Sequence, residues 1–116
     1  MSLGVNIIGM YKAKEVTAHN AITATATSSA VDCKGFRKAI LTFDITGSGD
    51  WTLTVNKSDS TGTTIVAADS TVTGGVKANV TADTWYILDP APDWITITAT
   101  ENSGTATVTV KVQPYN

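Results

Sequence analysis

Cysteine and basic residues are scarce in this sequence. The 116-residue chain has one cysteine, Cys33, so no disulfide can form within it, and no second thiol is present to build a metal site. Eight lysines and arginines stand against ten acidic residues, which gives a net charge of −2. Nucleic-acid-binding domains usually carry a basic stripe. The densest basic stretch here, Lys34, Arg37 and Lys38, is interpreted as a solvated loop or strand edge, and no nucleic-acid partner is predicted.

Long apolar runs are absent as well. No stretch approaches the ~18 apolar residues of a membrane-spanning helix, so no membrane association is predicted. The N-terminal sequence MSLGVNIIGMYKAKE lacks an early positive charge followed by a long apolar segment, and we expect no signal peptide there. Helical periodicity is also missing. The nearest candidate, AKEVTAH at residues 13–19, would supply one or two turns.

Residues that carry out chemistry are few. His19 has no serine or cysteine at a motif spacing, and we predict it to be a surface histidine. Cys33 is predicted to be a buried or half-buried structural residue. The stretches DITG (44–47) and DSTG (59–62) approach the Asp-Thr/Ser-Gly signature of aspartic proteases. Each carries an extra residue, however, and Asp, Thr and Gly are also the usual residues of hairpin turns.

Calcium-binding loops need several oxygen ligands at close spacing, and the stretches TGSGDW and DPAPDW hold only one or two carboxylates each. We therefore predict no catalytic residue, no metal site, no cofactor and no enzymatic activity.

What the chain does contain is threonine, which occurs 21 times. Threonine is β-branched and suits a pleated, half-exposed surface, so its abundance favours strands. Apolar and polar residues alternate through most of the chain, which is the pattern of strands with one buried face. The residues expected to face a core fall into three in-phase sets: Ala39, Leu41, Phe43 and Ile45; Trp51, Leu53 and Val55; and Ala106, Val108, Val110 and Val112.

Turn signals separate these runs. The segment 51–68 is predicted to be a β-hairpin with SDSTG at its tip, and Gly74-Gly75 is predicted to join strands at 70–73 and 76–80. Pro90 and Pro92 indicate a crossing connection, and ENSG (101–104) a tight turn. A weak strand is expected over 22–31. The chain is therefore predicted to be an all-β protein, an antiparallel β-sandwich of jelly-roll or immunoglobulin-like type with seven to eight short strands.

Residues 1–14 do not fit the alternating scheme and are assigned to an N-terminal arm, with the sandwich domain over 15–116. The arm is apolar, and its candidate contact residues are Val5, Ile7, Ile8 and Met10. Such a segment can add an edge strand to its own sheet. It can instead lie on a neighbouring subunit, because oligomers readily exchange such segments between their subunits. Both alternatives stay open at this point.

The three tryptophans raise an alternative function, because carbohydrate-binding β-sandwiches stack sugar rings on exposed indoles. Trp51 is in phase with Leu53 and Val55, and Trp85 is in phase with Ile87, so both are predicted to face the core. Trp94 is out of phase with Ile95 and Ile97. It is therefore the candidate stacking residue if the protein is a carbohydrate- or receptor-binding module.

The segment TSSAVDCKGFRKAILTFDITGSGDWTLTVNKSDSTGTTIV (27–66) resembles a pattern found in small virion proteins of tailed bacteriophages. In that pattern a Thr/Ser/Ala lead-in precedes a D-x-K-G-F/Y step and an apolar strand. A strand of G-x-x-T-L-x-V character then enters a polar hairpin. The ending WYILDPAPDWITITATENSGTATVTVKV (85–112) is similar to the last three strands of those proteins, and the likeness covers residues 25–113.

This resemblance implies a non-enzymatic structural protein of the phage particle, of the capsid decoration or cement type. Such proteins are mostly β and assemble as trimers on the outside of the shell. The implied location is therefore the capsid surface of the virion. The implied partners are the major capsid protein, or another virion protein, and further copies of the chain. The apolar arm would then supply a subunit or shell contact.

Overall fold

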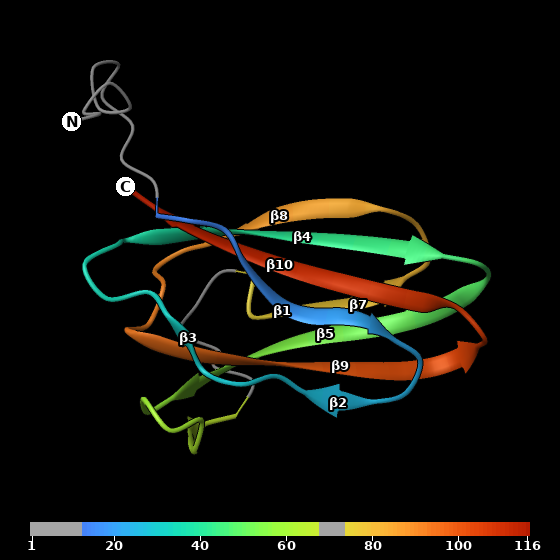
Figure 1. The fold of residues 1–116 in the computed structure, drawn as a ribbon, viewed down its shortest axis with the longest axis horizontal. Helices are drawn as coiled ribbons and strands as arrows, with labels where there is room; N and C mark the ends of the chain where they lie inside the picture. The colour runs from blue at the N-terminus through green and yellow to red at the C-terminus, as the bar shows by residue number, and fades with distance from the viewer. Residues whose placement is uncertain (1–12, 68–73) are drawn as a thin grey trace.

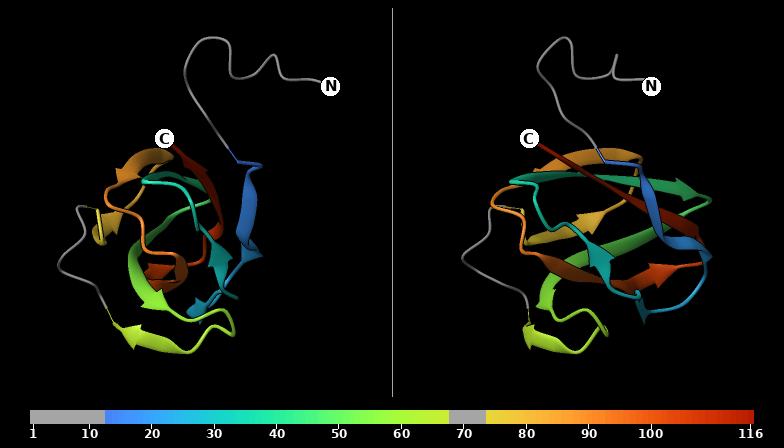
Figure 2. Two further views of the ribbon diagram at one scale, coloured as in Figure 1. Left: turned by 90° about the vertical axis from the view of Figure 1, so that its left-hand side faces the viewer. Right: turned by 60° about the vertical axis from the view of Figure 1, so that its left-hand side comes forward.

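A computed structural model describes residues 13–67 and 74–116 of the chain. Within these ranges the chain forms ten strands and no helix. The strands make two antiparallel sheets that lie face to face, as Figure 1 and the rotated views of Figure 2 show. The predicted antiparallel β-sandwich is confirmed. The strand number exceeds the expected seven to eight because three of the ten strands are only two or three residues long.

In chain order, the strands are β1 (Val16–Ile22), β2 (Ala26–Thr27), β3 (Val31–Asp32), β4 (Lys38–Thr46), β5 (Gly49–Ser58), β6 (Thr64–Val66), β7 (Val76–Val80), β8 (Thr84–Leu88), β9 (Trp94–Gly104) and β10 (Thr107–Tyr115).

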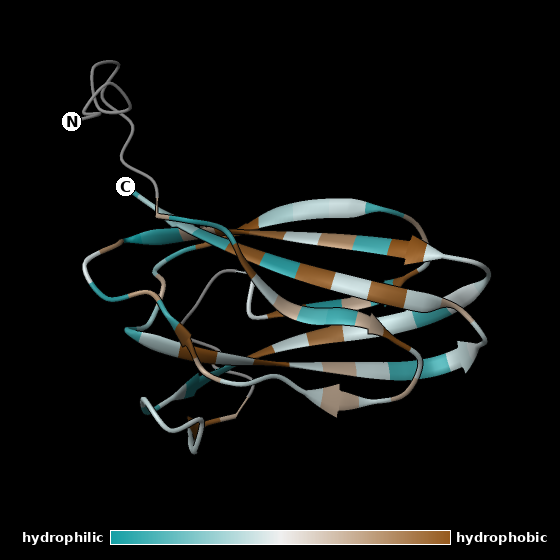
Figure 3. Ribbon diagram, viewed as in Figure 1, coloured by the Kyte–Doolittle hydropathy of each residue, from teal (hydrophilic) through white to brown (hydrophobic). Residues whose placement is uncertain are grey.

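The four-stranded sheet has the order β1-β10-β4-β8 and lies in the upper part of Figure 1. Its register sets apolar residues opposite one another, with Leu41 paired to Val112 and Phe43 paired to Val110. All four side chains are buried. Because side chains alternate between the faces of a strand, the intervening residues point to the outer face. Figure 3 shows this alternation as bands along β4 and β10.

The six-stranded sheet is built around β9 and β5, which pair from Gly49 opposite Gly104 to Lys57 opposite Ile95. Strands β2 and β3 pair with β9, and β6 and β7 pair with β5. The hairpin predicted for 51–68 is confirmed, because β5 and β6 are antiparallel neighbours joined by residues 59–63.

The core lies between the sheets. It contains the three predicted in-phase sets, with Ile45 partly buried at the margin, together with residues from β3, β7, β8 and β9. Trp51 is fully buried, as predicted. The members from the other strands and their flanks are Val31, Cys33, Val80, Leu88, Ile95, Ile97 and Ala99.

Several local predictions are wrong. ENSG (101–104) is not a turn but the end of β9, and the chain reverses at Thr105 and Ala106 instead. The amide of Thr105 donates to the carbonyl of Ser48 at 3.0 Å, which joins the β9–β10 connection to the β4–β5 connection. The pairing of Gly104 with Gly49 extends the ladder through residues that are usually found in turns.

The weak strand predicted for 22–31 is divided between the sheets. Its first residue closes β1 in the four-stranded sheet, and β2 and β3 belong to the six-stranded sheet, so the chain crosses over between them. Residues 13–19, the nearest helical candidate, run into β1. The predicted strand at 70–73 and nearly all of the N-terminal arm, including Val5, Ile7, Ile8 and Met10, lie outside the described residues.

Candidate interaction surfaces

Trp85 is the most exposed large apolar side chain of the described part of the chain, with 65% of its surface accessible. It stands on β8 and faces away from the core. Ile87, on the same side of β8, is 39% exposed. The sequence-based prediction that Trp85 and Ile87 face the core is therefore wrong.

The register explains the error. Strand β8 pairs with β4 so that Leu88 lies opposite Ala39 and Tyr86 opposite Leu41, and both β4 residues are buried. Tyr86 and Leu88 consequently face inward. Every residue of the run WYIL is apolar or aromatic, so alternation within β8 gives no phase. Only the pairing with β4, between residues far apart in the sequence, decides which side is buried.

The outer face of the four-stranded sheet gathers an apolar cluster around Trp85. Ile87 pairs with Ile40, Trp85 pairs with Thr42, and Ile40 pairs on its other side with Gln113. Ile40 is half-buried. We refer to Ile40, Trp85 and Ile87 as the Trp85 face. Opposite residues on neighbouring strands are close together, and diagonal ones lie within reach of an aromatic side chain, so the register places these three on one patch with a polar margin.

Trp94 lies at the start of β9, paired with Asp32 of β3, and is half-buried. The Lys34 ammonium stands 4.8 Å from the centroid of the indole ring and so occupies one of its faces. Lys34 also lies 3.9 Å from the Asp32 carboxylate. The remaining accessible surface of Trp94 is bordered by an exposed ion pair, an arrangement that offers both a stacking surface and hydrogen-bonding groups.

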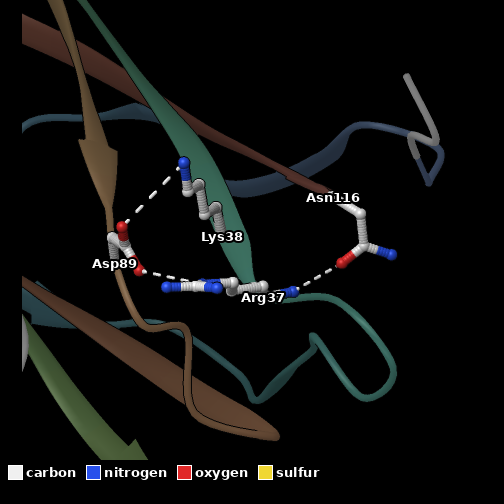
Figure 4. Close-up of polar contacts among 4 residues, drawn as sticks. All are labelled: Arg37, Lys38, Asp89 and Asn116. Carbon is white, nitrogen blue, oxygen red and sulfur yellow. Dashed lines mark hydrogen bonds and ion pairs between the residues drawn. The ribbon is translucent and has the colours of Figure 1, made fainter. Parts of the chain in front are cut away.

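The basic stretch ends at a small polar cluster shown in Figure 4. Arg37 and Lys38 approach the two carboxylate oxygens of Asp89 at 3.8 and 4.0 Å. The Arg37 amide donates to the Asn116 side-chain oxygen at 2.9 Å, which fixes the C-terminal residue to the loop before β4. Such long, exposed ion pairs contribute little free energy. The stretch is thus a loop leading into a strand, and its charges are partly neutralised by Asp89.

A shallow polar hollow lies at the opposite end of the sandwich, where the β4–β5, β7–β8 and β9–β10 connections pass between the sheets. Its lining is mostly backbone and hydroxyl groups with one carboxylate: Gly47, Ser48, Gly49, Asp50, Thr81, Ser103 and Gly104. The Asn102 amide donates to Asp50 at 3.0 Å and to Thr52 at 2.9 Å. The carboxylate of the hollow is therefore already engaged in holding β5 to β9.

His19 is buried, with 4% of its surface exposed, so its prediction as a surface histidine is wrong. A β-bulge explains the difference. Thr17 pairs with Lys111 and His19 pairs with Val110, which leaves Ala18 as an extra residue. Val110 faces the core, and the bulge brings His19 into the matching inward position. Its Nε2 lies 2.7 Å from the Ile97 carbonyl.

Cys33 is fully buried, as predicted. Burial, together with the neighbouring Asp32 and Asp93 carboxylates, raises the pKa of its thiol to about 12. Burial also raises the pKa of the Tyr86 hydroxyl. A thiol with a raised pKa is a poor nucleophile, because the thiolate is the reactive form.

The hairpin tip is organised by Asp59. One oxygen of its carboxylate accepts hydrogen bonds from the Thr61 amide, the Thr61 hydroxyl and the Thr63 amide, at 2.9, 2.6 and 3.0 Å. These donors lower the pKa of the Asp59 carboxyl. The DSTG stretch is accordingly a capped turn. Among residues 13–67 and 74–116, no group of three histidine, cysteine or acidic side chains is placed to hold a metal ion.

No family model matches the chain, and no curated protein does either. Among solved structures, the chain is similar to the SPBc2 prophage-derived protein YomS, with a TM-score of 0.63. The alignment covers 92% of this chain and 95% of YomS at 19% sequence identity. At this identity the likeness establishes the fold. In the part of the chain that the structure describes, no helix is long and apolar enough to cross a membrane.

Proposed function

We propose that this chain is a non-enzymatic structural protein of a bacteriophage particle, most concretely a decoration or cement protein on the outside of the capsid. The observation that carries the proposal is the shared fold with a prophage-derived protein over nearly the full length of both chains. The sequence resemblance to small virion proteins supports the same class independently, because it rests on strand and turn residues and not on coordinates.

The mechanism we propose is passive. Copies of the chain, assembled as trimers, would bury surface against one another and against the major capsid protein. Binding that favours the assembled state stabilises it by mass action, without turnover. Stable protein contacts of this kind bury roughly 800 Å² on each partner. The exposed Trp85 face and the apolar arm residues Val5, Ile7, Ile8 and Met10 are the surfaces we assign to these contacts.

The test uses particles purified from a lysate of a phage that encodes the chain. A decoration protein is expected at a fixed stoichiometric ratio to the major capsid protein, on the outside of the shell in immunogold electron microscopy. Recovery of the chain only in the soluble fraction would refute the proposal. Labelling confined to the tail would refute the capsid assignment and keep the virion assignment.

A second candidate function is a carbohydrate- or receptor-binding module centred on Trp94. The observation in its favour is the half-exposed indole bordered by the Lys34 ammonium and the Asp32 carboxylate. A glycan array tests this candidate with the native chain and Trp94→Ala side by side. Binding that disappears in Trp94→Ala would support it, and absence of binding at millimolar sugar would end it.

A further inference from the structure

The Trp85 face is an exposed apolar patch at the β8 edge of an otherwise polar sheet surface. Its neighbours on the outer face of β4 and β10 are Thr42, Lys111 and Gln113, and each is only partly exposed. Trp85 and Ile87 are 65% and 39% exposed on the edge strand of the sheet. Large apolar side chains gathered on one exposed patch with a polar margin are typical of a contact surface.

The size of the patch limits what can cover it. A stable contact between two rigid surfaces buries roughly 800 Å² on each side, whereas a tryptophan side chain contributes on the order of 200 Å². Three apolar side chains therefore fall short of a face-to-face dimer. They match instead a short extended segment that places a few apolar side chains on the sheet.

The N-terminal arm is such a segment, and the structure shows where it joins the domain. The Ala13 amide donates to the Pro114 carbonyl at 2.9 Å, and the Gln113 side-chain amide donates to the Ala13 carbonyl at 3.2 Å. Gln113 belongs to the outer face and pairs directly with Ile40 of the patch. Ala13, which follows the apolar residues of the arm in sequence, is thus held by the Gln113 side chain, which lies in the same cross-strand row as Ile40 and Ile87.

The direction of β1 favours a second copy as the place where the arm binds. Ala13 bonds to Pro114, and the ladder of β10 with β4 ends one pair further on, at Tyr115 and Lys38, so a straight continuation of β1 leads beyond the end of the sheet. Twelve residues in extended conformation span up to about 40 Å. An arm that reaches its own Ile87 must reverse its direction within a few residues, whereas an arm that reaches a neighbouring subunit need not.

We propose that residues 5–10 of one copy bind across the Trp85 face of a second copy. The proposal rests on the self-assembly included in the proposed function and identifies its contact. Residues 5–10 have apolar side chains on both sides of an extended chain, since Val5 and Ile7 alternate with Ile8 and Met10. One of these two rows covers the patch.

The test uses two variants of the full chain. The patch variant carries Trp85→Thr and Ile87→Thr, which keep β-branched residues on exposed strand positions. The arm variant carries serine at Val5, Ile7, Ile8 and Met10. A matched control carries Ile65→Thr and Val76→Thr, which remove two exposed apolar residues, 60% and 54% accessible, from the edge of the other sheet.

Sedimentation velocity over a range of concentrations gives the readout. We expect the native chain and the control to associate alike, and each variant alone to associate at least about tenfold more weakly, as expected for loss of a tryptophan contact. An equimolar mixture of the two variants is expected to recover association, because the intact arm of the patch variant meets the intact patch of the arm variant.

A monomeric native chain, or variants that associate like the native chain, would overturn the proposal. A mixture that recovers no association would overturn exchange between copies. If the patch variant fails to fold, acrylamide quenching of Trp85 in the arm variant replaces it. Quenching is then expected to rise above the native level at concentrations where the native chain associates, and unchanged quenching would contradict the proposal.

Particle binding separates this proposal from the proposed function. If both variants bind phage shells as the native chain does while self-association is unchanged, the arm contact is wrong and the virion role stands. If the native chain self-associates through the arm but is absent from purified particles, the arm contact stands and the virion role is wrong.

Discussion

The Nε2 atom of His19 lies 2.7 Å from the carbonyl oxygen of Ile97, and this bond joins the first strand of one sheet to the centre of the other. Because a carbonyl only accepts, Nε2 carries the proton. The same carbonyl also accepts the Ser28 amide at 2.9 Å. His19 is thus a buried link between the two sheets.

Replacing this histidine tests the link. We expect His19→Ala to lower the free energy of unfolding by about 1–3 kcal/mol, through the lost hydrogen bond and the space left in the core. Asn20→Ala, at the exposed neighbouring position, is the control and should change stability by less than about 0.5 kcal/mol. Urea denaturation measures both, and equal effects would contradict a buried role for His19.

Gly104 and Gly35 form a natural pair for a second prediction, since their φ angles are +91° and +84°. A Cβ at Gly104 would overlap the Ser48 carbonyl oxygen and lie 2.5 Å from the Gly49 Cα, whereas a Cβ at Gly35 would meet nothing within 4 Å. Gly35→Ala should cost about 1–2 kcal/mol from the left-handed backbone alone. Gly104→Ala should cost at least about 1 kcal/mol more, because backbone must move. Similar melting temperatures for the two variants would contradict the close approach.

The burial of Cys33 predicts a low reactivity of its thiol and a pH dependence of the stability of the fold. Its thiol should resist an aromatic disulfide reagent at pH 8 and react fully in urea. In the unfolded chain the Cys33 thiol ionises above its ordinary pKa of 9.0. In the folded chain the raised pKa keeps the thiol protonated up to about pH 12. Cys33 therefore stabilises the fold below pH 9, and this contribution falls as the pH rises from 9 to 12. The difference in stability between the native chain and Cys33→Ala isolates it, and a difference that grows with pH would contradict the assignment.

Asp59 predicts the opposite pH dependence at the hairpin tip. Its lowered pKa means that the ordered turn is stabilised at pH values above the ordinary pKa of a carboxyl group. This stabilisation is lost as the pH falls through the pKa that Asp59 has in the folded chain. Amide exchange at Thr61 and Thr63, corrected for the intrinsic effect of pH, should accelerate on acidification. Asp59→Ala should exchange rapidly at all pH values. Asp59→Asn keeps an acceptor and is expected to fall between them.

Much of the fold could be predicted from the sequence because its central strands alternate cleanly. Phe43, Leu53, Val55 and the valines of β10 have polar neighbours on both sides, so only one phase buries them well. The same alternation, interrupted by the polar cluster SDSTG, predicts the hairpin at 51–68.

The remaining features depend on contacts between distant residues. Trp85 was predicted on the wrong face because Tyr86 and Leu88 are equally able to fill the core, and only pairing with β4 distinguishes the two phases. His19 was predicted on the surface because its burial depends on a bulge against β10. The local sequence pattern determines neither the strand register nor the position of a bulge. Trp85 and His19 are nevertheless among the residues that matter most, Trp85 for contacts and His19 for stability.

The exposure of Trp85 can be checked by fluorescence. Trp51 is fully buried and Trp94 half-buried, so Trp85 should account for most of the emission that acrylamide quenches in dilute solution. Trp85→Phe is expected to remove the red-shifted, quenchable component and to leave stability within about 0.5 kcal/mol of the native chain. Loss of a blue-shifted component instead would place Trp85 in the core.

The pairing of the first and last strands has a mechanical consequence. Strands β1 and β10 are antiparallel, and Ala13 bonds to Pro114, two residues before Asn116. A force applied to the two termini would therefore open the ladder from one end, breaking its bonds in succession and not together. A fold arranged in this way yields at low tension when it is pulled by its own ends.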